Sequence, residues 1–269
     1  MKKKVIDEIV RVCDKEILAK MWGSKLSNSP KGNIARYLIT DFRAFGLLTG
    51  IVRHYVYREG LDEQVFYRGQ NEEWPLKPKL YRKCYTKERV TLADQWKEKA
   101  LRIVEKANFD FDGTIDEREA LSQHYGLATS FIDVVDHIQT ALWFAYDNIP
   151  KENSVGYVYV ISVPKNKATI IDLRNKPSKW LRPHIQQAFC FKMREITEFG
   201  KISESYHIMT FVVPKDLLKI WSGYDFLSQE NMYPPKSKDS GLSFWGSARL
   251  RLEQAGLGLD PNEWIEKHL

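Results

Sequence analysis

Apolar residues near the start of the chain recur every three or four positions, which is the spacing of one face of an amphipathic helix. These residues are Val5, Ile6, Ile9, Val10, Cys13, Ile17 and Met21. We expect this helix to end near Gly23. Polar and turn-forming residues fill positions 24–33 and predict a loop. A second helical region is predicted from about position 34 to position 57.

Short β-prone runs and helical segments alternate in the middle of the chain. Residues 63–70, EQVFYRGQ, predict a strand that ends at the positive charge of Arg68. Prolines at positions 75 and 78 exclude a regular helix at that point. A helical pattern follows at 88–106, and after the acidic segment FDFDGTIDE another helix is expected to run through Leu121.

The second half of the chain predicts mainly strands. Residues 128–135, ATSFIDVV, have the length and apolar content of a buried strand, and Asp136 is a candidate cap for the helix that follows. The other predicted elements are strands at 156–163, 168–173 and 205–213 and a short helix at 214–221. The predicted fold class is α+β, with a helical N-terminal part leading into a mixed, largely antiparallel sheet.

Composition and cysteine usage narrow the class of protein. Hydrophobic residues make up 43% of the chain, which supplies a packed core and argues against disorder. The three cysteines, Cys13, Cys84 and Cys190, lie far apart, without the spacing of a disulfide framework or a zinc site. We therefore expect no metal and a cytoplasmic location, where thiols stay reduced. Residues 1–18 lack the continuous apolar core of a signal peptide, and no membrane partner is expected.

The charge of the chain is modestly basic. Its formal net charge is +6 and its pI is about 9.0, which favours anionic partners through long-range attraction. The basic residues are mixed with acidic ones, and the pure basic run at 2–4 is typical of a solvated terminus. Nucleic acid therefore stays open as a partner beside a nucleotide-type small molecule.

Several sequence blocks, in order, resemble one known family. They are FYRGQ at 66–70, PKLYRK at 78–83, QHYGLATSFIDVVDHIQTALWFA at 123–145, RPHIQQAF at 182–189 and FVVPKDLLKIW at 211–221. This combination is similar to the FRG domain of bacterial and phage proteins. The resemblance implies an N-terminal helical region at 1–59, an FRG-like α+β domain at 60–235, and a C-terminal extension at 236–269 packed on that domain. It also implies a role in phage and host conflict, as antiviral defence.

The chain departs from the family pattern at two points. Ser130 stands where the family usually has an arginine, so a basic residue is missing before Asp133. Ala188 stands where a glycine usually follows the paired glutamines, which leaves no open backbone at that position.

The order of the blocks also resembles that of ADP-ribosyltransferases, which implies a similar fold and NAD as the cofactor. By position, Arg68 would anchor the dinucleotide together with Gly69 and Gln70, because a guanidinium binds phosphate or ribose oxygens in a bidentate manner. A glycine at 69 would permit close backbone approach. Three residues would complete the binding site, and they are Tyr125, Thr129 and Ser130.

Three further residues are candidates for catalysis. His124 titrates near neutral pH and is a candidate general acid or base, although a hydrogen-bonded packing role is an equal alternative. Gln187 takes the late position of the resemblance, but it is neutral and stabilises positive charge on ribose far less than a carboxylate does. Asp133 or Glu195 would take that part if the fold brings either near, and Asp133 has capping of the next turn as its alternative.

Three hypotheses about function stay open. The favoured hypothesis is an enzyme that uses NAD or a related nucleotide, either transferring ADP-ribose or hydrolysing the glycosidic bond. The second is a nucleic-acid binding or processing module, which the basic charge and the many aromatic residues support. The third is a non-catalytic domain that senses a ligand. The sequence does not predict an oligomeric state.

Overall fold

The computed structural model of this chain describes residues 25–27, 35–58, 60–107, 113–176, 179–194 and 206–269. The predicted N-terminal helix, Cys13 and Glu195 lie outside the described residues. The chain forms two compact units, each built from discontinuous segments. Of the described residues, those within 25–74, 134–168 and 206–229 belong to the first unit, and those within 75–133, 169–194 and 230–269 belong to the second.

The first unit is built on a mainly antiparallel sheet, which confirms the predicted fold class. Its strands follow one another in the order β1-β2-β8-β5-β3-β4, and only the β2 and β8 pair is parallel. The central strands are in register at Tyr67 with Val160 and at Val158 with Phe211. These strands are β1 (Lys25–Ser27), β2 (Ala35–Leu38), β3 (Glu63–Gln70), β4 (Ile132–Val135), β5 (Val155–Pro164) and β8 (His207–Pro214).

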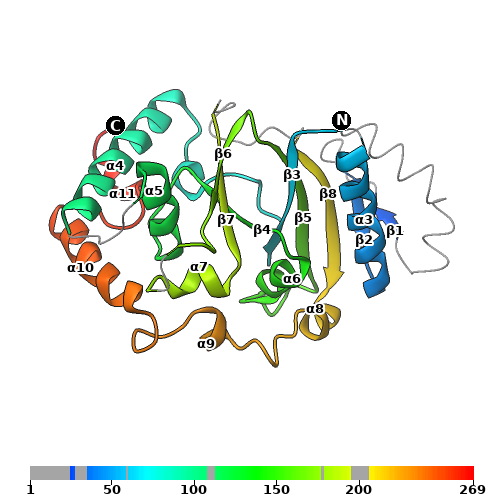
Figure 1. The fold of residues 1–269 in the computed structure, drawn as a ribbon. Helices are drawn as coiled ribbons and strands as arrows, with labels where there is room; N and C mark the ends of the chain where they lie inside the picture. The colour runs from blue at the N-terminus through cyan, green and yellow to red at the C-terminus, as the bar shows by residue number, and fades with distance from the viewer. Residues whose placement is uncertain (1–24, 28–34, 59, 108–112, 177–178, 195–205) are drawn as a thin grey trace. The chain divides into compact units, whose positions relative to one another are not determined.

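Three helices pack on one face of this sheet. They are α3 (Phe42–Arg58), α6 (Ile138–Tyr146) and α8 (Lys215–Trp221). In Figure 1, α3 runs alongside β8, and the rings of Phe45 and Phe211 meet edge to face at 5.1 Å. The side chains of Leu48 and Val52 are fully buried against the same cluster as Val158 and Val160. Alternate residues of β3 and β5 therefore face the helices, as the period of a strand requires.

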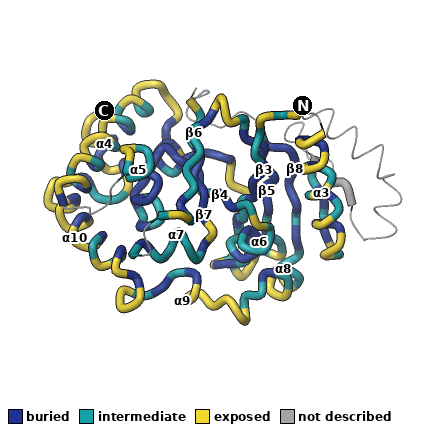
Figure 2. The backbone as a smooth tube through the Cα atoms, in the orientation of Figure 1, coloured by how far each residue is buried: buried dark blue, intermediate teal, exposed yellow. Residues whose placement is uncertain are grey.

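The second unit is mainly helical around its own hydrophobic core. Trp96 is fully buried, and its indole Nε1 donates to the carbonyl of Leu257 at 2.9 Å. Along α4 and α10, the residues that face the core are buried and the residues on the opposite side of each helix are exposed (Figure 2). Strand β7 lies between β6 and β4 in the order of strands. The first two residues of β4 belong to this second unit. The elements are a short 3₁₀ turn η1 (Lys79–Tyr81), α4 (Lys87–Lys106), α5 (Ile115–His124), β6 (Ala168–Asp172), α7 (Leu181–Ile185), β7 (Ala188–Met193), α9 (Gln229–Met232), α10 (Ser240–Gln254) and α11 (Asn262–Glu266).

Three predictions from the pattern are wrong in detail. The predicted loop at 24–33 contains strand β1, and the predicted helix from position 34 begins only at Phe42, because β2 pairs with β8 instead. Asp136 is not the cap of α6, because His137 holds that position, and the carbonyl of Asp136 accepts from Arg53 at 2.7 Å. Among the described residues, no helix is long and apolar enough to span a membrane.

Candidate active site

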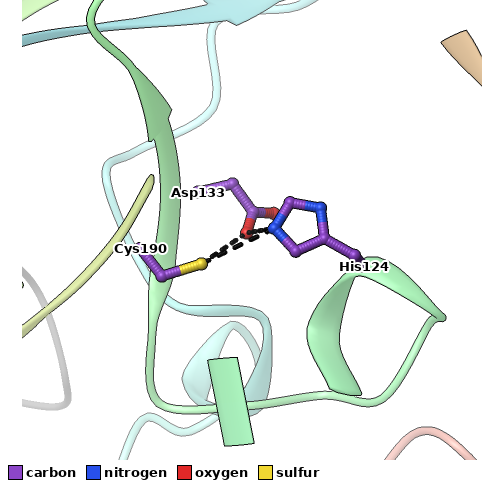
Figure 3. Close-up of side chains that lie close together, drawn as sticks. All are labelled: His124, Asp133 and Cys190. Carbon is purple, nitrogen blue, oxygen red and sulfur yellow. Dashed lines mark hydrogen bonds and ion pairs between the residues drawn. The ribbon is translucent and has the colours of Figure 1, made fainter. Parts of the chain in front are cut away.

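His124, Asp133 and Cys190 meet in the second unit (Figure 3). His124 ends helix α5, Asp133 lies on β4, and Cys190 lies on the neighbouring strand β7. The Cys190 Sγ atom lies 3.3 Å from Asp133 Oδ1 and 3.7 Å from His124 Nε2. The distance from His124 Nε2 to Asp133 Oδ1 is 3.6 Å. Three donor atoms of different chemistry thus face one another.

Gln186 sets the orientation of the His124 ring. The Gln186 Nε2 group donates to the carbonyl of Met232 at 3.0 Å, so the amide oxygen Oε1 is the atom that faces His124. This oxygen lies 3.0 Å from His124 Nδ1, and because it only accepts, Nδ1 must carry the hydrogen. The other ring nitrogen, Nε2, is therefore the atom presented to Asp133 and Cys190. Such a contact fixes both the tautomer and the ring angle.

Burial differs sharply among the three members of the cluster. Cys190 is fully buried, and the His124 side chain is only 5% exposed. The Asp133 side chain is 41% exposed. The carboxylate is therefore the part of the cluster that a molecule from solvent reaches first.

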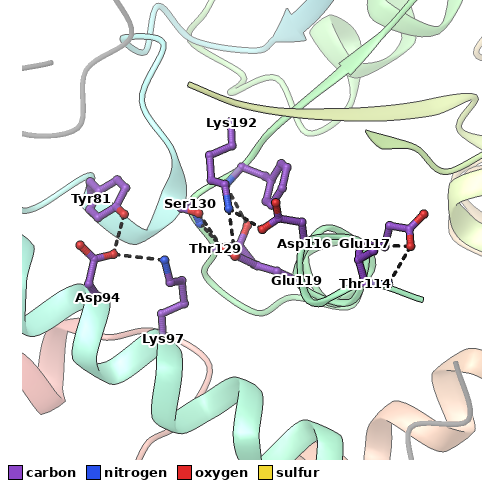
Figure 4. A network of polar contacts seen from close by, with 11 residues as sticks. Tyr81, Asp94, Lys97, Thr114, Asp116, Glu117, Glu119, Thr129, Ser130 and Lys192 are labelled. Carbon is purple, nitrogen blue, oxygen red and sulfur yellow. Dashed lines mark hydrogen bonds and ion pairs between the residues drawn. The ribbon is translucent and has the colours of Figure 1, made fainter. Parts of the chain in front are cut away.

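Thr129 and Ser130 are engaged inside the second unit. Both backbone and side chain of Ser130 donate to Glu119 Oε1 at 2.7 Å, and the Thr129 hydroxyl bonds to Gln123. Lys192 extends this network, 3.9 Å from the Glu119 carboxylate (Figure 4). Thr129 and Ser130 are buried, so both hydroxyl groups already satisfy internal partners. In this structure they hold the segment just before β4 to α5.

Tyr125 is likewise an internal residue. Its hydroxyl lies 3.1 Å from both carboxylate oxygens of Asp239, which is itself fully buried. Burial, followed by the negative charge of Asp239, raises the pKa of Tyr125 well above its ordinary value. The phenol is therefore a neutral donor that joins α5 to the start of α10.

Arg68, Gly69 and Gln70 lie on β3 in the first unit. Gly69 packs against α6 so closely that a Cβ atom would lie 1.8 Å from the carbonyl oxygen of Ala141. Gln70 is buried and donates to the carbonyl of Trp74 at 2.9 Å. Arg68 is half-buried and is paired in register with Tyr159 of β5. The element that approaches the Gly69 backbone closely is therefore helix α6.

Of the paired glutamines, Gln186 contacts the cluster and Gln187 does not. The Gln187 side chain donates to the carbonyl of His184 at 2.9 Å on an exposed surface. Its φ of 51° lies in the left-handed region, which reverses the chain between α7 and β7. The contact with His124 is made by Gln186, so no contact with His124 supports the catalytic role predicted for Gln187.

Sequence reasoning missed Cys190. It lies in the segment AFCFKM, where the alternation of a buried strand hides a reactive side chain among apolar ones. Its partners His124 and Asp133 are far away in sequence, so no spacing rule connects the three. The apolar run after RPHIQQ was the available signal, because it predicts a strand that could bring Cys190 beside another strand.

One comparison with known proteins gives a match. The FRG domain model matches residues 63–154, which contain His124 and Asp133 but neither Gln186 nor Cys190. No curated protein matches the chain, and no solved structure does so either.

Proposed function

Since residues 63–154 of this chain are an FRG domain, we propose that they carry the chemical centre of an enzyme that uses NAD or a related nucleotide. The proposed reaction is cleavage of the glycosidic bond, with water or another acceptor taking the ADP-ribosyl group. The observation that carries this proposal is the exposed Asp133 carboxylate held beside the buried His124 ring. The sequence resemblance to ADP-ribosyltransferases supplies the substrate class.

The chemistry of glycosidic cleavage suits this pair. The bond from ribose C1′ to the nicotinamide nitrogen breaks, and its electron pair leaves with the nitrogen. Positive charge then develops on the ribose, and a fixed carboxylate such as Asp133 stabilises it. The attacking oxygen bonds to C1′ and releases one proton, which passes to the His124 and Asp133 pair. Gln186 acts as a positioning residue through its contact with His124 Nδ1.

The test is NAD consumption with product analysis for the purified full chain and its Asp133→Asn variant. Asparagine keeps the shape of the side chain and removes its charge, so we expect turnover to fall by roughly 10²–10³-fold. The matched control is Asp172→Asn, which changes another partly exposed carboxylate of the second unit that pairs with Arg174. Equal turnover in wild type and Asp133→Asn would refute the assignment of the carboxylate.

The nucleotide binding predicted for Arg68, which lies in the first unit, is tested separately by direct binding measurements. Arg68→Ala is expected to weaken nucleotide binding by about tenfold or more, because a charge-assisted hydrogen bond is worth about 1.5–3 kcal/mol. Arg68→Lys keeps the charge and loses the bidentate fork, and it should bind with intermediate affinity. Nucleotide binding without turnover in the wild type would instead favour a ligand-sensing domain. Nucleic-acid binding that falls steeply with salt would favour the alternative module.

The proposed biological setting is conflict between phage and host. It is supported only by the resemblance to FRG-domain proteins of bacteria and phages.

A further inference from the structure

The three donor atoms of the cluster are spaced as ligands of one metal ion. A tetrahedral zinc ion has Zn–S bonds of about 2.3 Å and Zn–N or Zn–O bonds of about 2.0–2.1 Å, so its ligand atoms lie about 3.3–3.6 Å apart. The cluster has 3.3 Å between sulfur and oxygen, 3.6 Å between nitrogen and oxygen, and 3.7 Å between sulfur and nitrogen, each within about 0.3 Å of the tetrahedral spacing for that pair. The nitrogen to oxygen distance is too long for a hydrogen bond, and a shift of about 0.3 Å brings the two atoms to the spacing of zinc ligands.

We propose that His124 Nε2, Asp133 Oδ1 and Cys190 Sγ bind one zinc ion, and that this ion inhibits the enzyme. The donor set selects the metal, because calcium and magnesium prefer oxygen ligands alone, whereas imidazole with thiolate suits zinc. Three protein ligands leave a fourth position for water. The exposed Asp133 side chain provides the route of entry to a cluster that is otherwise buried.

The surroundings of His124 favour metal binding. Gln186 holds the hydrogen on Nδ1, so the lone pair of Nε2 points at the oxygen and the sulfur. A carbonyl partner on the second ring nitrogen is the usual support of a zinc-bound histidine. Helix α5 also ends at His124, and the partial negative charge of a helix C-terminus favours a cation.

Charge balance is favourable once the thiol loses its proton. In this step zinc replaces the thiol proton. The covalent S–H bond of Cys190 breaks, an S–Zn bond forms, and the proton goes to solvent. One thiolate and one carboxylate then neutralise the two charges of the ion. No oxidant or reductant is required.

The inhibition of turnover by zinc rests on the proposed function, whereas the binding of zinc to the cluster does not. Bound zinc would occupy the oxygen of Asp133 and the nitrogen of His124 that face the cluster. The carboxylate would then no longer stabilise positive charge on ribose, because the ion has neutralised it. Cys190 has no part in the proposed catalysis, so its removal separates the two roles.

The experiment is a zinc titration of the full chain after treatment with a chelator, with bound metal measured directly and affinity measured by competition. We expect one zinc ion per chain. Cys190→Ser and His124→Gln should each weaken binding by more than about tenfold, since even outer partners of zinc ligands are worth about 10–100-fold. Cys84→Ser is the matched control, because Cys84 is also buried but contacts the carbonyls of Leu80 and Arg89.

A Co²⁺ titration gives a second readout, which reports the thiolate ligand directly. Cobalt bound to a thiolate absorbs strongly, and this band should appear in the wild type and in Cys84→Ser but not in Cys190→Ser. Retention of the band in Cys190→Ser, or failure of the wild type to bind zinc in the titration, would overturn the proposed metal site.

The inhibitory role is tested by repeating the NAD assay with and without zinc. Wild-type turnover should fall when one equivalent of zinc is bound, and the ratio of turnover with zinc to turnover without zinc should be closer to one for Cys190→Ser, each protein being compared with its own zinc-free sample. Turnover that zinc does not affect in the wild type would refute inhibition and leave the binding result intact. If no sample consumes NAD, the proposed function fails, while the metal measurements still decide the site.

Discussion

At the scale of single residues, Gly69 illustrates how a motif residue acquires a packing explanation. In the FYRGQ block, the glycine invites an interpretation as space for a ligand. The structure instead places α6 there, with the Ala141 carbonyl oxygen and the Ala145 nitrogen at 1.8 Å and 2.7 Å from an added Cβ. Both neighbours are backbone atoms, so a side chain at this position forces β3 and α6 apart.

We therefore predict that Gly69→Ala destabilises the protein by at least about 1–3 kcal/mol, as overpacking of a tight contact does. Chemical denaturation followed by circular dichroism measures this change. Gly46→Ala is the control, because Gly46 is exposed within α3 and an added Cβ meets nothing within 4 Å. That variant should gain up to about 1 kcal/mol. A Gly69→Ala protein of unchanged stability would contradict the packing explanation.

At the scale of elements, helix α5 connects a local sequence signal to the cluster. It begins with a capping box in which the Thr114 amide donates to Glu117 Oε2 at 2.8 Å and the Glu117 amide donates to Thr114 Oγ1 at 3.2 Å. It ends at His124. Lys176, followed by the Thr114 amide, lowers the pKa of Glu117 below its ordinary value of 4.5. The start of this helix is therefore stabilised by an ionised carboxylate.

This cap predicts a pH-dependent stability. A lowered folded-state pKa stabilises the protein above pH 4.5, and the contribution disappears as pH falls through the folded-state value. Glu117→Gln should therefore be less stable than wild type at pH 7, and the difference should shrink as the pH falls below 4.5. Thermal unfolding of both proteins at pH 7 and at a pH below 4.5 measures this difference in stability. Glu98→Gln, at an exposed position of α4, is the control for the same change of residue type, and a stability difference between Glu117→Gln and wild type that does not change with pH would reject the prediction.

At the scale of the whole molecule, the matched FRG segment is not a self-contained core. Residues 63–154 contribute to the hydrophobic clusters of both units. In the second unit, Trp96 packs with Trp264 and Leu252 from the C-terminal helices. In the first unit, Val65 and Tyr67 pack with Phe211 of β8. The segment predicted as a C-terminal extension therefore supplies part of a core.

We predict that a fragment of residues 63–154 does not fold. It lacks strand β5, which pairs along the whole of β3, and it lacks the apolar partners named above. Apolar surface left in water removes the main driving force for folding. The fragment should show neither dispersed amide resonances nor a cooperative thermal transition, whereas the full chain shows both. A cooperative transition in the fragment would contradict this view of the two cores.

The local pattern of the sequence determined much of the element content. Apolar spacing at 88–106 predicted α4 within one residue of its start, and β-branched runs predicted β5 and β8, because these signals depend on neighbours along the chain. Local pattern failed at β2, where four residues pair with β8 from the other end of the chain. A strand specified by such a distant partner carries little signal of its own.

The sequence by itself also selected His124 and Asp133 as reactive residue types, because their chemistry is intrinsic to the side chain. Only the tertiary structure decided that Cys190 joins them and that Gln186 rather than Gln187 contacts His124. The reason is geometric. The cluster joins a helix end to two adjacent strands, and the left-handed turn at Gln187 directs its side chain outward. Neither the pairing of strands nor the direction of a side chain after a turn is encoded in residue spacing.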